Sequence, residues 1–164
     1  MKSKKGIIIT AIVLAAITAA SFTVWMIPQN APTRFVVSNA QEDLDALMEQ
    51  QKVVADSATE EFDNMLAGRI TPENYVSIAE IYHTQINSFI IKIMDSEIPS
   101  EWNGSYSAFL EHLRAYNSYL RESLVAANKL KDNSGADISE QMSKMDQYLA
   151  QADEFLSLAN SSRP

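Results

Sequence analysis

The sequence predicts an all-α protein, an N-terminal single transmembrane helix followed by an antiparallel up-down-up-down four-helix bundle. Three observations lead to this fold. An uncharged apolar run occupies residues 6–27. After it, apolar side chains recur at alternating steps of three and four residues, which is the period of an amphipathic helix. Capping residues, glycine and proline interrupt this pattern at three places, and the short connections make each helix an antiparallel neighbour of the next.

Residues 6–27 have the properties of a membrane anchor. A helix of about 20 apolar residues crosses the hydrocarbon core, and the three lysines in residues 1–5 favour a cytoplasmic N-terminus. We therefore expect a single-pass protein of the plasma membrane whose C-terminal domain is extracytoplasmic. A cleaved signal peptide is the alternative, because small residues precede Ser21. The apolar run is longer than a usual signal sequence, which favours the anchor.

The composition of the remaining chain excludes several classes of protein. Without the three N-terminal lysines, 10 basic residues stand against 21 acidic ones, and this balance of about minus 11 repels nucleic acid. There is no cysteine, so disulfide scaffolds, thiol catalysis and thiolate metal sites are excluded. The chain also lacks a Gly-x-Ser-x-Gly motif and a glycine-rich phosphate loop. We expect neither an enzyme nor a cofactor.

The first helix should follow a short stalk. Residues 28–37 contain two prolines and no helical period, so we expect them to be extended, ahead of a single bundle domain in residues 38–164. The helix should begin near Ser38, where Ser-x-x-Gln offers a capping box, and Gly68 should end it. The positions expected to face the core are Leu44, Met48, Gln51, Ala55, Ala58, Phe62 and Met65.

The second helix has the strongest start signal in the chain. Thr71 is a good N-cap, Pro72 suits the first helical position and Glu73 favours the first turn. The helix should run to about Met94, before a break at residues 95–99. Its inward positions are Tyr75, Ala79, Tyr82, Ile86, Phe89 and Ile93.

The last two helices should start at Ser100 and at Asp137. Ser100 is expected to act as an N-cap, and Asp137 with Glu140 forms an acidic variant of the capping box. The inward positions of the third helix are Trp102, Tyr106, Phe109, Leu113, Tyr116, Leu120 and Ala127. Those of the fourth are Ile138, Met142, Met145, Leu149, Ala152, Leu156 and Ala159.

In length, anchor and helix count, the chain resembles the extracytoplasmic four-helix sensor domains of bacterial and archaeal receptors. No motif accompanies the resemblance. Such receptors normally return through a second membrane helix to a cytoplasmic signalling region, whereas this sequence stops at Pro164. We therefore expect that the chain alone does not carry a signal inward.

The two histidines are the candidate metal ligands. If the second and third helices pair about a turn near residue 97, His83 and His112 lie level at the edge of a shared groove. Glu80 precedes His83 by three residues, the spacing by which a ferritin-like bundle presents a carboxylate and an imidazole on one face. A metal ion would take these three ligands. Histidines at helix interfaces more commonly only form hydrogen bonds.

The tyrosines offer a second kind of site. Together with Trp102, the six tyrosines would line a pocket for a small ligand between the helices, although aromatic stripes more often form core. The six are Tyr75, Tyr82, Tyr106, Tyr116, Tyr119 and Tyr148.

The end of the second helix carries more apolar surface than a two-helix contact needs. Ile91 stands where the polar face should continue, and Ile98 and Trp102 in the adjoining turn extend the apolar region. These residues are either buried in the bundle or in contact with a partner or the membrane. We therefore expect a non-catalytic accessory or interaction subunit that docks onto a membrane or cell-surface protein. The alternative is a small-ligand or metal-binding module of the sensor type.

Overall fold

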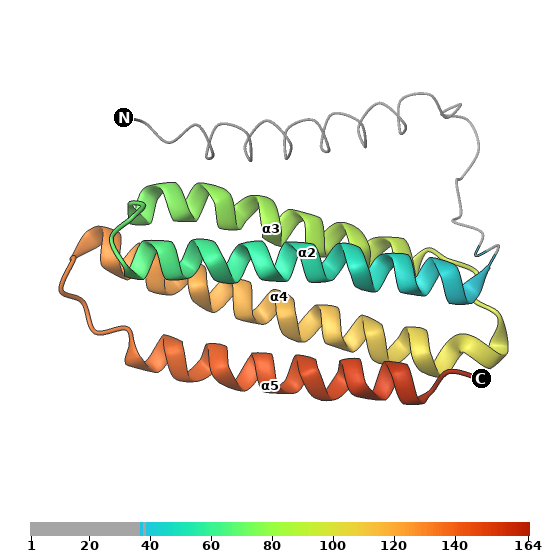
Figure 1. The fold of residues 1–164 in the computed structure, drawn as a ribbon. Helices are drawn as coiled ribbons and strands as arrows, with labels where there is room; N and C mark the ends of the chain where they lie inside the picture. The colour runs from blue at the N-terminus through green and yellow to red at the C-terminus, as the bar shows by residue number, and fades with distance from the viewer. Residues whose placement is uncertain (1–36, 38) are drawn as a thin grey trace, which may run out of the picture. The chain divides into compact units, whose positions relative to one another are not determined.

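The computed structural model describes residue 37 and residues 39–164, and all the long elements in this part are helices. Successive helices run in opposite directions, side by side (Figure 1). The elements are α2 (Ala40–Leu66), α3 (Pro72–Met94), the 3₁₀ turn η1 (Ser100–Trp102), α4 (Asn103–Asp132) and α5 (Ser139–Ser161). The predicted all-α four-helix bundle is therefore confirmed. The predicted anchor at residues 6–27 lies outside the described residues, among which no helix is long and apolar enough to cross a membrane.

Helix α4 is the central element of the bundle. Its backbone approaches α5 most closely and α3 next, whereas α2 and α5 scarcely approach each other. Small side chains on the buried face of α4 allow neighbouring backbone to come near. They are Ser105, Ala108, Ala115, Ser123, Ala126 and Ala127. Residues Ala152 and Ala159 of α5 are also small and fully covered.

Helix α2 is held by large aromatic side chains instead. The ring of Phe62 packs edge-on against Tyr75 of α3, with centroids 5.3 Å apart. From α4, the Tyr106 hydroxyl donates to the carbonyl of Ala40 at 2.8 Å, and the Tyr116 hydroxyl donates to the carbonyl of Ala55 at 3.3 Å. Phe62 and Tyr75 thus pack together between α2 and α3, and the hydroxyls of Tyr106 and Tyr116 join α4 to the α2 backbone.

The inward face of α2 differs in part from the predicted one. Leu47 and Val54 are buried, whereas Met48 and Ala55 are only partly covered. Because α2 and α5 do not come close to each other, the positions of α2 that face α5 are covered less completely. Met48 faces that side, where it contacts Arg163 beyond the end of α5.

The start of α2 uses a reciprocal cap one residue after the predicted position. The Asn39 side chain accepts a hydrogen bond from the backbone N–H of Glu42 at 3.3 Å, and the Asp43 carboxylate accepts one from the N–H of Asn39 at 3.4 Å. The start of α3 is as predicted, with Thr71 accepting from the N–H of Asn74 and Pro72 as the first helical residue.

The starts of α4 and α5 are not as predicted. Ser100 opens the 3₁₀ turn instead of capping α4, and its hydroxyl donates to the Glu101 carboxylate. Asp137 accepts from the N–H of Ser139, which closes a tight turn before α5, while Glu140 pairs with Lys144 at 2.7 Å. Local side-chain partners therefore compete with the capping geometry at both places.

Gly68 ends α2 with a positive φ of 68°. A residue with a Cβ is strained in this conformation by about 1 to 2 kcal/mol. No atom lies within 4 Å of an added Cβ, so the strain comes from the backbone and not from a clash. We expect Gly68→Ala to lower the free energy of unfolding by about 1 to 2 kcal/mol in urea titrations. An unchanged or raised stability would contradict the left-handed conformation.

Candidate functional site

His112 is buried in the core, with 3% of its surface exposed. Its Nδ1 lies 2.8 Å from the carbonyl oxygen of Ala152, so Nδ1 carries the proton and donates across the α4–α5 interface. The ring stacks on Phe109 at a centroid distance of 5.5 Å. Nε2 is also buried and has no hydrogen-bond partner among the described residues. Burial lowers the pKa of the imidazole, which is therefore held neutral.

The structure does not bring Glu80, His83 and His112 together as a ligand set. The Nδ1 of His83 lies 3.2 Å from the side-chain amide of Asn87 on its own helix, whereas His112 binds α5. In the part of the chain that the structure describes, no group of three or more His, Cys, Asp or Glu side chains is arranged to hold a metal ion.

A pair of asparagines fixes the contact between α3 and α4 instead. The Asn117 amide donates to the side-chain oxygen of Asn87 at 3.0 Å. Because α3 and α4 are antiparallel and Asn87 lies level with Asn117, His83 lies level with a position further along α4 than His112. The histidines therefore do not face each other as the assumed turn position required, because η1 lengthens the connection between the helices.

The tyrosines form core. Tyr75 and Tyr106 are almost completely buried, and the Tyr75 hydroxyl donates to Ser123 at 2.7 Å. Burial raises the pKa of Tyr106 to about 12. Trp102 is partly covered and packs against the same core.

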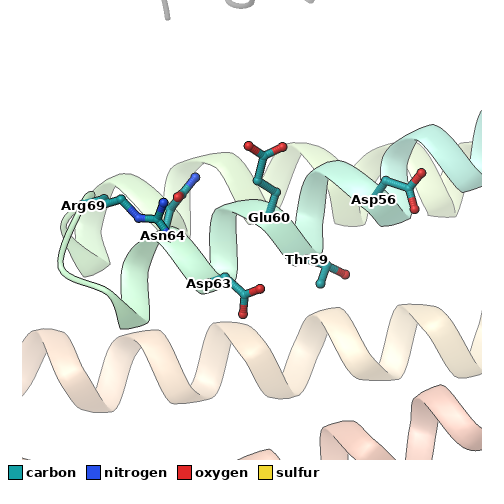
Figure 2. Close-up of a pocket in the computed structure, with 6 residues that line it drawn as sticks. All are labelled: Asp56, Thr59, Glu60, Asp63, Asn64 and Arg69. Carbon is teal, nitrogen blue, oxygen red and sulfur yellow. The ribbon is translucent and has the colours of Figure 1, made fainter. Parts of the chain in front are cut away.

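A shallow concavity of about 400 Å³ lies along the second half of α2. Its lining residues are Asp56, Thr59, Glu60, Asp63, Asn64 and Arg69, all from α2 and the following turn. Figure 2 shows that these side chains spread in different directions and do not converge on one point. Asp56 is already paired with Lys52 at 2.6 Å. The arrangement therefore has no centre at which a small molecule would be held.

The end of α3 exposes adjacent apolar side chains. Ile91 is 58% exposed and Met94, three residues later on the same side of the helix, is 60% exposed. We call these two residues the α3-end surface. Arg114 of α4 lies beside it, with Nη2 4.0 Å from the sulfur of Met94. Ile98, like Trp102, packs against the core and is only partly exposed.

The sequence predicts Ile91 as a contact residue and places Met94 in the apolar turns around it, but it does not indicate Arg114. The signal for Met94 was present, because it follows Ile91 by three residues in a helix that is apolar nearly all round there. Arg114 carries no such signal, since its place beside Met94 depends on the register between α3 and α4.

The chain matches no family model, no curated protein and no solved structure.

Proposed function

We propose that this chain is a membrane-anchored, extracytoplasmic helical bundle that acts as a non-catalytic interaction subunit and docks onto a membrane or cell-surface protein. The observation that carries the proposal is the exposure of Ile91 and Met94 as neighbours on one helix face. Other exposed large apolar residues, such as Val53 on α2, Ile81 on α3 and Leu158 on α5, have no exposed large apolar residue three or four positions away. Adjacent exposed apolar side chains with no cover in the bundle are typical of a contact surface.

The position of the α3-end surface supports a partner in or at the membrane. The hydrogen bond from Tyr106 to Ala40 joins the start of α4 to the start of α2, so the α3–α4 connection lies at the end where the described chain begins (Figure 1). A stalk of about ten residues reaches at most about 35 Å. If residues 6–27 span the bilayer, a stalk of this length tethers the start of α2 within that distance of the membrane surface.

The proposal is tested by purifying the tagged full-length chain from native membranes in mild detergent. We expect a specific membrane or cell-surface protein in stoichiometric amount, and no stoichiometric metal by elemental analysis. A bound metal in place of a protein would favour the sensor-type alternative and contradict the proposal.

Attachment to the membrane is a separate prediction. We expect the protein to stay in the membrane pellet after alkaline carbonate washing and to keep its own N-terminal sequence, because residues 6–27 are long and apolar and are preceded by lysines. Extraction and N-terminal sequencing measure this. A mature N-terminus at Ser21 would contradict the anchor.

The substitution Ile91→Glu should leave the bundle folded. Ile91 is more than half exposed, so a carboxylate there stays in water and costs little. Thermal denaturation of residues 34–164, followed by circular dichroism, should give similar midpoints for the variant and the unchanged fragment. An unfolded Ile91→Glu variant would mean that Ile91 belongs to the core.

A further inference from the structure

The charges around the α3-end surface are mostly negative. Asp95 directly follows Met94 and is exposed, and Glu97 and Glu101 stand exposed in the connection to α4. On the α4 side, Arg114 forms an ion pair with Glu111 at 2.6 Å, so that cation is already matched by an anion of its own helix. Lys92 is the other cation at the end of α3, and the balance at this edge is therefore acidic.

An apolar centre with an acidic edge favours one kind of binding surface over others. Anionic lipid headgroups are repelled by the edge and by the excess of acidic over basic residues in the chain. A second copy of the chain brings the same acidic edge to the contact. A protein surface with apolar side chains inside a ring of Lys or Arg can pack against the apolar centre and pair with the acidic edge.

We propose that the α3-end surface binds a protein segment whose apolar side chains are flanked by basic residues. This inference rests on the proposed function and adds the chemistry of the partner. Ile91 and Met94 supply the apolar contact, while Asp95 and Glu101 attract the basic edge. Because Ile91 and Met94 offer a small area, the charges raise the rate of encounter and set the specificity.

The test uses the full-length chain in native membranes with a photo-activated benzophenone amino acid at position 91. The control carries the same amino acid at Val53, which is also 58% exposed but lies on α2. We expect a protein adduct from position 91 and not from position 53, with Lys or Arg flanking the cross-linked peptide of the partner. Its yield should fall several-fold between about 0.1 M and about 1 M salt, because the screening length shortens from about 10 Å to about 3 Å.

Charge reversal gives the second readout. Asp95→Lys with Glu101→Lys should reduce the yield several-fold, whereas Glu49→Lys with Glu60→Lys changes the net charge equally on exposed positions of α2 and should not. A protein adduct whose yield is the same at both salt concentrations and in both double variants would contradict a basic partner but would be consistent with the proposed function. An adduct with lipid alone would assign the surface to the bilayer, and no adduct specific to position 91 would overturn the docking surface itself.

Discussion

Phe62→Ala is expected to lower the free energy of unfolding of residues 34–164 by about 3 to 5 kcal/mol. Only 3% of Phe62 is exposed, and its ring packs edge-on against Tyr75. Truncation removes the buried ring and leaves a cavity between α2 and α3. The effect should be large because α2 is held mainly by aromatic side chains, with few close approaches of its backbone to the other helices.

Urea denaturation followed by circular dichroism measures this change. Glu60→Ala is the control, since Glu60 lies on the same helix and is exposed, and its stability should change by less than about 0.5 kcal/mol. Equal small effects at the two positions would mean that Phe62 does not contact the core.

The stability of the bundle should fall between about pH 7.5 and about pH 5.5 through the titration of His112. Burial lowers the pKa of His112 below its ordinary value of 6.5, and the opposing effects of the Ala152 hydrogen bond and the Asp153 carboxylate are smaller. Protonation would place a second N–H at Nε2, which is buried without a partner.

The sign follows from proton binding. As the pH falls through 6.5, the unfolded chain takes up a proton at this residue before the folded bundle does. The stabilising contribution of neutral His112 is therefore present above pH 6.5, decreases below it, and levels off under the folded-state pKa. The slope for one proton does not exceed about 1.4 kcal/mol per pH unit.

Urea titrations of residues 34–164 at the two pH values measure the effect. His112→Gln keeps a donor for the Ala152 carbonyl but cannot titrate, so its stability should depend less on pH than that of the unchanged fragment. If both proteins lose the same stability on acidification, other groups are responsible.

Many features of the bundle could be predicted from local sequence patterns. The Thr71-Pro72 start, the left-handed Gly68 and the inward positions Tyr75 and Phe109 depend on neighbours in sequence, which a single chain displays. The starts of α4 and α5 did not follow, because 3₁₀ and Asx-type turns use the same residue types as helix caps.

The relation between helices was harder to predict. The pairing of His83 with His112 assumed an even turn, whereas η1 shifts the register and His112 turns to α5. The unequal spacing of the helices likewise depends on side-chain size at several interfaces together, which no single periodicity contains. For this reason Leu47 and Val54 were missed as core.

The most direct measurement is the amount of partner that co-purifies with three full-length proteins: the unchanged chain, Ile91→Glu and Val53→Glu. Each substitution places a carboxylate at a position that is 58% exposed, one in the α3-end surface and one on α2. We predict that Ile91→Glu reduces the co-purified partner at least about tenfold, a loss of about 1.4 kcal/mol, and that Val53→Glu leaves it unchanged. Equal recovery with all three proteins would contradict docking through the end of α3.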